Sequence, residues 1–126
     1  MHTTMLEHIN ITVSDADKTA ALFCHLFGWH VRWAGPAKDD GYTVHVGNSD
    51  CYLALYTATK QLQRAGSYKN IGHLNHIGIL VSDLDSVEQQ ILQLGYNTFN
   101  HADYEPGRRF YFMLRDNIEI EVISYQ

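Results

Sequence analysis

Two histidines stand at equivalent places in a repeated segment, and two glutamates alternate with apolar residues near the end of the chain. His8 and His76 lie in twelve-residue segments that share eight residues at a constant offset of 68. Glu119 and Glu121 are separated by a single isoleucine. Neutral imidazole and ionised carboxylate are ligands for Zn²⁺, Fe²⁺, Mn²⁺ and Ni²⁺, and two histidines with one carboxylate leave coordination positions open for a substrate. These residue types therefore point to a divalent metal centre.

The repeat predicts that the chain consists of two similar halves, 5–58 and 73–124, joined by a polar linker. Each half begins with an alternating strand, continues with an amphipathic helix and ends with three strand-like runs. The fold class is therefore α+β, with the order βαβββ in each half. The three later strands are expected at 29–34, 41–47 and 51–58 in the first half and at 97–101, 108–115 and 118–124 in the second.

The ends of the two helices carry recognisable signals. Ser14 and Ser82 are predicted to be the N-caps, because serine accepts a hydrogen bond from the first helical turn. Gly28 and Gly95 are predicted to end the helices, since glycine adopts the left-handed conformation that commonly follows a last turn.

Alternation assigns the candidate ligands to one face of each sheet. In the last strand the isoleucines and the valine take the helix-covered face, so Glu119 and Glu121 take the other, and His8 and His76 also oppose the apolar positions of their strands. Packing of the halves about a pseudo-twofold axis would bring the two first strands to the centre of a curved mixed sheet with a concave cleft. The same pattern would arise from solvated surface residues, or from a histidine retained after duplication without a role.

Two stretches of sequence resemble the vicinal oxygen chelate superfamily, which contains glyoxalase, bleomycin-resistance and extradiol-dioxygenase proteins. The repeated segments LEHINITVSDAD and LNHIGILVSDLD resemble its opening strands, and RRFYFMLRDNIEIEV resembles its closing hairpin, usually Y-F-x-D-P-D-G-N-x-I-E. The resemblance implies one domain over 1–126 with one divalent metal ion (Zn, Fe, Mn or Ni) bound by His8, His76 and Glu121. It also implies that Tyr111 is a catalytic residue near the metal, although a strand tyrosine serves packing more often and its face depends on the hairpin register.

The closing strand of the first half departs from the glyoxalase I pattern. Ala54 stands where the resemblance would place an acid opposite Glu121, and alanine neither binds a metal nor accepts a proton. Four-ligand glyoxalase I chemistry is therefore disfavoured. A His-His-Glu set resembles extradiol dioxygenases and fosfomycin-resistance thiol transferases, so dioxygenase, lyase or isomerase, and thiol-transferase chemistry on a small molecule with adjacent oxygens stay open.

Several further residues, Ala54 among them, are predicted to contact the substrate. Tyr52 and Tyr56 flank Ala54 on the uncovered face and supply an aromatic wall with polar tips. His45 is a candidate from the middle strand of the first half, and Arg109 is a candidate partner for an anionic substrate, although both residue types are often simply solvated.

Composition limits the choice of partners. The chain has 126 residues, a net charge of −5 and no basic cluster longer than two residues, so nucleic acid is not expected as a partner. No apolar run reaches the length of a membrane span, and no signal peptide is recognisable, so we expect a cytoplasmic protein that does not enter the membrane. A homodimer is expected, with each site formed within one chain or shared between two. A metal-free protein that sequesters a small molecule, of the bleomycin-resistance type, is the alternative to an enzyme.

Overall fold

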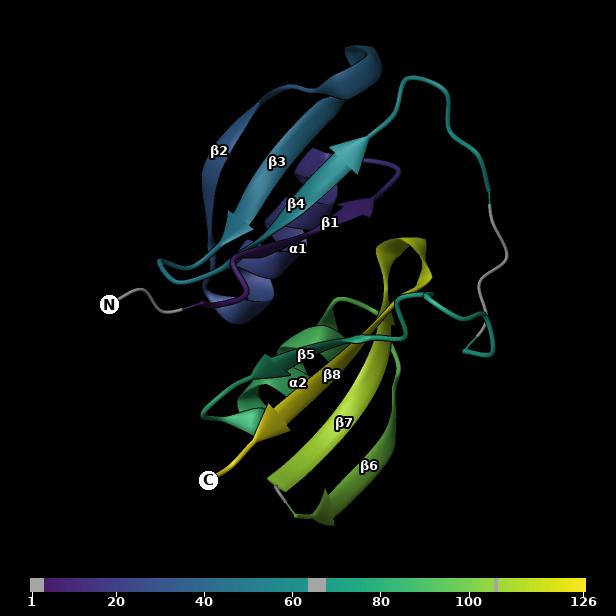
Figure 1. Ribbon diagram of the computed structural model, residues 1–126. Helices are drawn as coiled ribbons and strands as arrows, with labels where there is room; N and C mark the ends of the chain where they lie inside the picture. Colours follow the sequence, from purple (N-terminus) through teal and green to yellow (C-terminus); the bar gives the residue numbers. More distant parts are fainter. Residues whose placement is uncertain (1–3, 64–67, 106) are drawn as a thin grey trace. The chain divides into compact units, whose positions relative to one another are not determined.

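The computed structural model describes residues 4–63, 68–105 and 107–126. By its internal contacts the chain divides into two compact units, Met1–Leu62 and Gln63–Gln126. Each unit is a four-stranded mixed sheet with one α-helix against it (Figure 1). The α+β class and the two βαβββ modules are thus confirmed.

The first unit has the strand order β1-β4-β3-β2, in which β1 runs parallel to β4 and the other neighbours are antiparallel. Its elements are β1 His8–Thr12, α1 Ala16–Phe27, β2 His30–Pro36, the short 3₁₀ helix η1 Lys38–Asp40, β3 Tyr42–Gly47 and β4 Tyr52–Thr57.

The second unit repeats this arrangement with the order β5-β8-β7-β6 and a parallel β5–β8 pair. Its elements are β5 Ile77–Leu80, α2 Leu84–Gln93, β6 Thr98–Tyr104, β7 Gly107–Leu114, the 3₁₀ helix η2 Arg115–Asn117 and β8 Ile118–Ser124. Strand β6 extends three residues further than the sequence predicts and contains a register shift between Phe99 and Ala102.

The predicted N-caps Ser14 and Ser82 are wrong by one residue. The caps are Asp15 and Asp83, whose carboxylates accept hydrogen bonds from backbone amides three residues further on, at 3.0 and 3.1 Å. Serine and aspartate are both good N-cap residues, so a Ser-Asp pair offers two candidates in succession. In both units the aspartate is the N-cap, because the residue after it is the first with helical φ/ψ angles. Gly28 follows α1 with a φ of +69°, in the left-handed region predicted for it.

The helix-covered face of each sheet holds the core. In the first unit Phe23 of α1 packs there with Val44, Val46 and Leu55, and all four are buried. The corresponding core of the second unit consists of Ile91, Phe110, Phe112, Ile120 and Val122. The side chains that alternate with these point to the opposite face, and within each unit no helix of the described residues covers that face (Figure 1). None of the described helices is long and apolar enough to cross a membrane.

Candidate metal centre

The parallel pairing of β5 with β8 brings a histidine and a carboxylate together on the uncovered face of the second sheet. His76 directly precedes β5, and Glu121 is paired with Gly78, two residues after His76 and therefore on the same face. His76 Nε2 lies 3.1 Å from Glu121 Oε1. The Glu121 side chain is only 12% exposed and that of His76 is 33% exposed, so the pair is shielded but reachable.

The second ring nitrogen of His76 is also engaged. Nδ1 lies 2.7 Å from Oδ1 of Asn75, the residue before it, and 3.9 Å from Oε2 of Glu119. An Nδ1–H that donates to Asn75 leaves the Nε2 lone pair facing the Glu121 carboxylate. The 3.1 Å separation fits either a hydrogen on Nε2 that donates to Glu121 or a metal ion bound by both atoms.

Tyr111 is brought beside this pair by the β7–β8 register. It is directly opposite Glu121 in the antiparallel pair, and its ring meets the His76 ring edge-on, with centroids 5.6 Å apart. Burial raises the pKa of Tyr111, and the negative charge of Glu121 and a hydrogen bond to it raise it further. The phenol therefore keeps its proton at neutral pH and is a hydrogen-bond donor next to the pair.

Arg109 contacts the same carboxylate from the other side. Its Nη1 donates to Glu121 Oε2 at 2.8 Å, and its side chain is only 10% exposed. Sequence reasoning predicts a contact with substrate for this residue, whereas the structure gives its guanidinium a protein partner.

Two residues at this face, Asn75 and Tyr68, were missed as contributors to the site by reasoning from the sequence, and Glu119 was considered only as a candidate ligand. Asn75 holds His76, Glu119 lies near its Nδ1, and the Tyr68 hydroxyl donates to Glu119 Oε1. The adjacency of Asn75 to a candidate ligand was a usable signal, and Glu119 was already placed on this face. Tyr68 lies in the linker, where no periodic pattern indicates which way a side chain turns.

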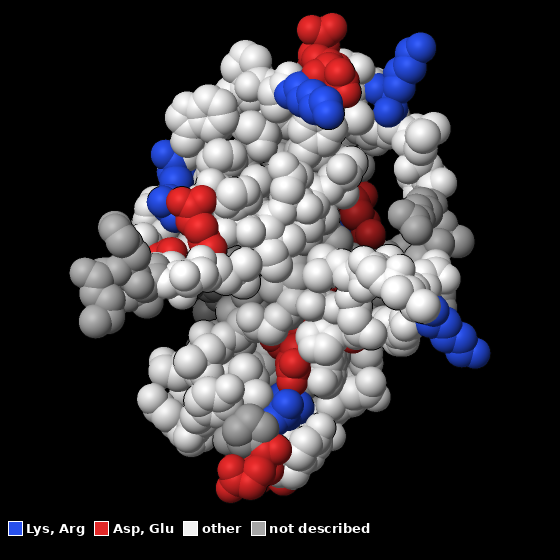
Figure 2. All heavy atoms as spheres, in the orientation of Figure 1, with Lys and Arg blue, Asp and Glu red and all other residues white. Residues whose placement is uncertain are grey.

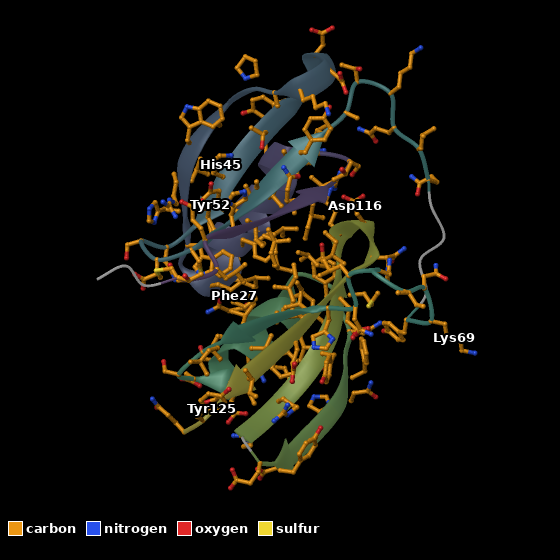
Figure 3. All side chains as sticks on the ribbon, viewed as in Figure 1. Phe27, His45, Tyr52, Lys69, Asp116 and Tyr125 are labelled. Carbon is orange, nitrogen blue, oxygen red and sulfur yellow. The ribbon has the colours of Figure 1, made fainter. Side chains whose placement is uncertain are left out.

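The first unit carries a related cluster around His8. Nδ1 of His8 lies 2.8 Å from Glu7 Oε1, so the residue before the histidine again supplies an oxygen. The His8 ring stacks on Tyr52 with centroids 4.9 Å apart, and His45 stacks on Tyr52 at 4.7 Å (Figure 3). Burial lowers the pKa of His45, and the charges of His8 and Arg32 lower it further.

Ala54 is the counterpart of Glu121 by strand register. Ala54 is paired with Asn10 in the parallel β1–β4 pair, and Glu121 is paired with Gly78 in β5–β8. Asn10 and Gly78 are 68 positions apart, which is the offset of the repeat. The first unit therefore has no carboxylate where the second has its candidate ligand.

The remaining predicted substrate contact, Tyr56, is engaged within its own unit. Its hydroxyl donates to the Lys38 carbonyl oxygen at 2.7 Å. Its ring covers Gly41, where a Cβ atom would lie 2.6 Å from the ring. Tyr56 thus helps to fix the β2–β3 connection.

The candidate residues form two groups. His76, Glu121, Tyr111 and Arg109 lie together in the second unit. The other predicted site residues lie in the first unit; they are His8, His45, Tyr52, Ala54 and Tyr56. Among the described residues, no three His, Cys, Asp or Glu side chains are already gathered as a metal-binding group, so the His76–Glu121 pair requires a further ligand.

Figure 2 shows the charged side chains on one face of each unit. On the face drawn in Figure 2, the lysine and arginine side chains do not gather into a continuous basic patch in either unit. The long run of cations that a nucleic-acid backbone requires is not seen on that face.

Comparison with known proteins identifies a family. Residues 5–122 match the family model of the Glyoxalase/Bleomycin resistance protein/Dioxygenase superfamily. No curated protein sequence matches the chain.

Solved structures share the fold. A glyoxylase/bleomycin resistance protein/dioxygenase domain from Frankia sp. EAN1pec has a TM-score of 0.82 at 17% identity, over 99% of this chain and 100% of that chain. A mutant of the fosfomycin resistance protein FosX from Listeria monocytogenes, complexed with Mn(II) and 1S,2S-dihydroxypropylphosphonic acid, has a TM-score of 0.73 at 21% identity, over 97% and 93% of the two chains. FosX from Mesorhizobium loti has a TM-score of 0.71 at 21% identity, over 97% and 92%.

Proposed function

Because the chain belongs to the Glyoxalase/Bleomycin resistance protein/Dioxygenase superfamily, we propose that it is a divalent-metal-dependent enzyme that acts on a small molecule with adjacent oxygens. Its metal ligands are His8, His76 and Glu121. The observation that supports this most directly is the 3.1 Å separation of His76 Nε2 and Glu121 Oε1 on the uncovered face of the second sheet.

The donor pair fits a first-row divalent metal. Ligand atoms at about 2.1 Å from an ion, at octahedral or tetrahedral angles, lie roughly 3.0 to 3.4 Å from each other. The observed separation of His76 Nε2 and Glu121 Oε1, 3.1 Å, falls in this interval. The oxygen of Asn75 on Nδ1 is the kind of contact that fixes the tautomer of a metal-binding imidazole and orients its ring.

The proposed third ligand comes from the other unit. His8 occupies the position of the repeat that corresponds to His76, and its Nδ1 is likewise held by the preceding side chain, that of Glu7. Both histidines are therefore prepared to bind through Nε2. The residue types on offer, imidazole and carboxylate, suit Mn, Fe, Zn or Ni, and the metal identity is left open.

In this proposal each group near the metal has a defined task. When bound, the metal supplies Lewis-acid polarisation and a template for two adjacent substrate oxygens. Tyr111, with its raised pKa, holds a proton beside the site, and in the proposal its hydroxyl exchanges the hydrogen bond to Glu121 for one to a substrate oxygen. Tyr52 and His45 provide stacked rings on the face that carries His8, where an unsaturated or apolar part of the substrate would lie.

The reaction belongs to one of three classes: dioxygenation, lyase or isomerase chemistry, or thiol transfer. The FosX complex with Mn(II) holds a compound with two adjacent hydroxyl groups, which supports the pairing of a metal with neighbouring oxygens. Four-ligand glyoxalase I chemistry is not part of the proposal, because Ala54 occupies the place of a fourth ligand.

Metal analysis tests the proposal. Protein purified without chelator should contain a divalent metal in stoichiometric amount, and both His76→Ala and Glu121→Ala should lose it. His101→Ala is a matched control, because His101 Nε2 forms a separate histidine–carboxylate pair with Glu88 at 2.6 Å. Stoichiometric metal that persists in Glu121→Ala would overturn this ligand set.

A metal-free binding protein is the second candidate. It is favoured by the ring series in the first unit, in which Trp33 contacts His45 at 5.2 Å and His45 stacks on Tyr52 at 4.7 Å. Trp33 is 51% exposed and is available to an aromatic ligand. Ligand affinity that is unchanged by chelator and by His8→Ala would favour this function over the enzyme.

The proposal includes a homodimer as the working assembly and a cytoplasmic location. The dimer is an expectation from the family resemblance, and the proposed ligand set is compatible with it because His8 can come from a second chain. A molecular mass in solution equal to one chain would remove this part of the proposal and leave the ligand set intact.

A further inference from the structure

Arg109 is held in place by its own neighbourhood in the second unit. Its Nε and Nη2 donate to the Gly107 carbonyl oxygen at 3.4 and 3.3 Å. Its guanidinium carbon lies 4.7 Å from the centre of the Tyr104 ring, within the range of a cation–π contact. The guanidinium therefore has a fixed direction before any ligand binds.

The two carboxylate oxygens of Glu121 have different partners, because the guanidinium of Arg109 is bound to only one of them. Arg109 Nη1 donates to Oε2 at 2.8 Å, while Oε1 faces His76 Nε2 at 3.1 Å. With side-chain exposures of 10% for Arg109 and 12% for Glu121, water does not readily replace either partner. A free carboxylate can bind a metal through one oxygen or both. Here one oxygen is already taken.

We propose that Arg109 is a positioning residue that restricts Glu121 to metal binding through Oε1 alone. The inference rests on the proposed function, because it concerns the same ligand. A carboxylate that donates one oxygen occupies one coordination position instead of two, so a further position stays available for a substrate oxygen. Arginine suits this task because its guanidinium remains charged at all ordinary pH values.

This role replaces the substrate contact that the sequence analysis predicts for Arg109. Nη1, Nη2 and Nε each have a protein acceptor, so the side chain is committed to Glu121 and Gly107. Gly107 lies against the neighbouring strand, where an added Cβ would collide with the Ser124 carbonyl oxygen.

The neighbouring arginine provides a matched control. Arg108 alternates with Arg109 along β7 and pairs with Asp85 at 2.8 Å, with a side chain that is 47% exposed. Arg108→Met and Arg109→Met remove the same charge and the same donors from adjacent positions. Only the second change removes the Arg109 donor from Oε2 of Glu121, and the Tyr111 hydroxyl that is hydrogen-bonded to this carboxylate is the same in both variants.

The experiment measures the water bound to Mn(II). Chelator-treated protein is loaded with Mn(II), and the paramagnetic relaxation of water protons reports how many exchangeable waters the ion carries. Arg109→Met should lose a single water relative to wild type, because Glu121 then binds through both oxygens. Arg108→Met should match wild type. An unchanged water count in Arg109→Met would overturn the inference.

A second measurement does not depend on the stability of the Arg109 variant. In the infrared spectrum the separation of the two carboxylate stretches differs between one-oxygen and two-oxygen metal binding. The band of Glu121 is identified by its disappearance in Glu121→Gln. A wild-type Mn(II) difference spectrum should show the wide separation of one-oxygen binding, and a narrow one would overturn the inference.

The results distinguish a failure of the proposed function from a failure of the role proposed for Arg109. Wild-type protein that binds no Mn(II), or that binds it equally in Glu121→Ala, overturns the proposed function and this inference with it. Mn(II) binding that requires His76 and Glu121 but is unaffected by Arg109→Met leaves the proposed function standing and overturns only the role of Arg109.

Discussion

Ala54 occupies in the first sheet the register position that Glu121 occupies in the second. Each is paired with the residue two positions after its unit's repeated histidine, in β1 or β5, and each has a β3 or β7 residue directly opposite. The residues opposite are His45 and Tyr111, so the two units carry different chemistry at equivalent positions. The duplicated framework is symmetric, whereas its polar side chains are not.

Introducing an acid at Ala54 should create a second histidine–carboxylate pair. In Ala54→Glu the new carboxylate takes the place relative to His8 that Glu121 has relative to His76, so we expect tighter Mn(II) binding than in wild type. Ala54 is only 3% exposed, and an unpaired buried polar group costs about 1–3 kcal/mol, so the metal-free variant should be less stable by a similar amount. Calorimetric titration with Mn(II) and urea unfolding measure the two effects. Ala54→Gln, without the charge, is the control, and equal metal affinity in both variants would contradict the prediction.

Removing the oxygen that holds His76 should weaken metal binding. Asn75→Ala leaves Nδ1 without its 2.7 Å contact, and loss of such a contact typically costs about 10–100-fold in metal affinity. Asn75→Asp keeps an acceptor oxygen and should retain most of the affinity. Competition with a chelator of known strength measures both variants. Equal affinities in Asn75→Ala and wild type would show that the ring needs no such support.

His45 should make the protein less stable in mild acid. Burial lowers the pKa of His45 in the folded protein, whereas the unfolded chain binds the proton with an ordinary pKa of about 6.5. The unfolded state therefore takes up more protons as the pH falls below that value, and the free energy of unfolding decreases there; above it, His45 contributes no pH dependence.

The variant His45→Gln tests this dependence, because glutamine does not titrate. Its free energy of unfolding, measured in urea between pH 7 and about 5, should fall less steeply with acid than that of wild type. His25→Gln, at the last turn of α1, is the control. A slope in His45→Gln equal to that of wild type would contradict the assignment.

A site shared between two chains should be rescued by mixing two inactive variants. His8→Ala lacks the ligand from the first unit and Glu121→Ala lacks one from the second, so neither should bind Mn(II) stoichiometrically. If the third ligand comes from a partner chain, mixed dimers contain one complete site. When the two variants are denatured and refolded together, random pairing makes about half of the dimers mixed. Each mixed dimer should bind about half as much Mn(II) as a wild-type dimer, because one of its two sites is complete. Recovery in the mixture would exclude a site within one chain.

The sequence was sufficient for the fold because the repeat carries several consistent signals. Ile9 and Ile77 mark the first strands, the stripe on each helix marks the core face, and Gly28 marks the end of α1. Alternation also placed Glu121 on the uncovered face, since a strand has a period of two residues.

Contacts between side chains on different strands could not be predicted in the same way. The pairing of Arg109 with Glu121 depends on the β7–β8 register and on the direction taken by a long flexible side chain. Tyr68 reaches Glu119 from a segment without regular structure. No periodic pattern of residue types in the sequence predicts either contact.

The neighbouring acids Glu119 and Glu121 have a consequence for the sequence of binding events. These two carboxylates share one face with the single guanidinium of Arg109, so together the three groups carry an excess of one negative charge. A dication reverses the sign of that excess. A negatively charged reactant would thus bind more weakly to the metal-free protein than to the metal-loaded one, so the charge of this face favours binding of the ion before the reactant.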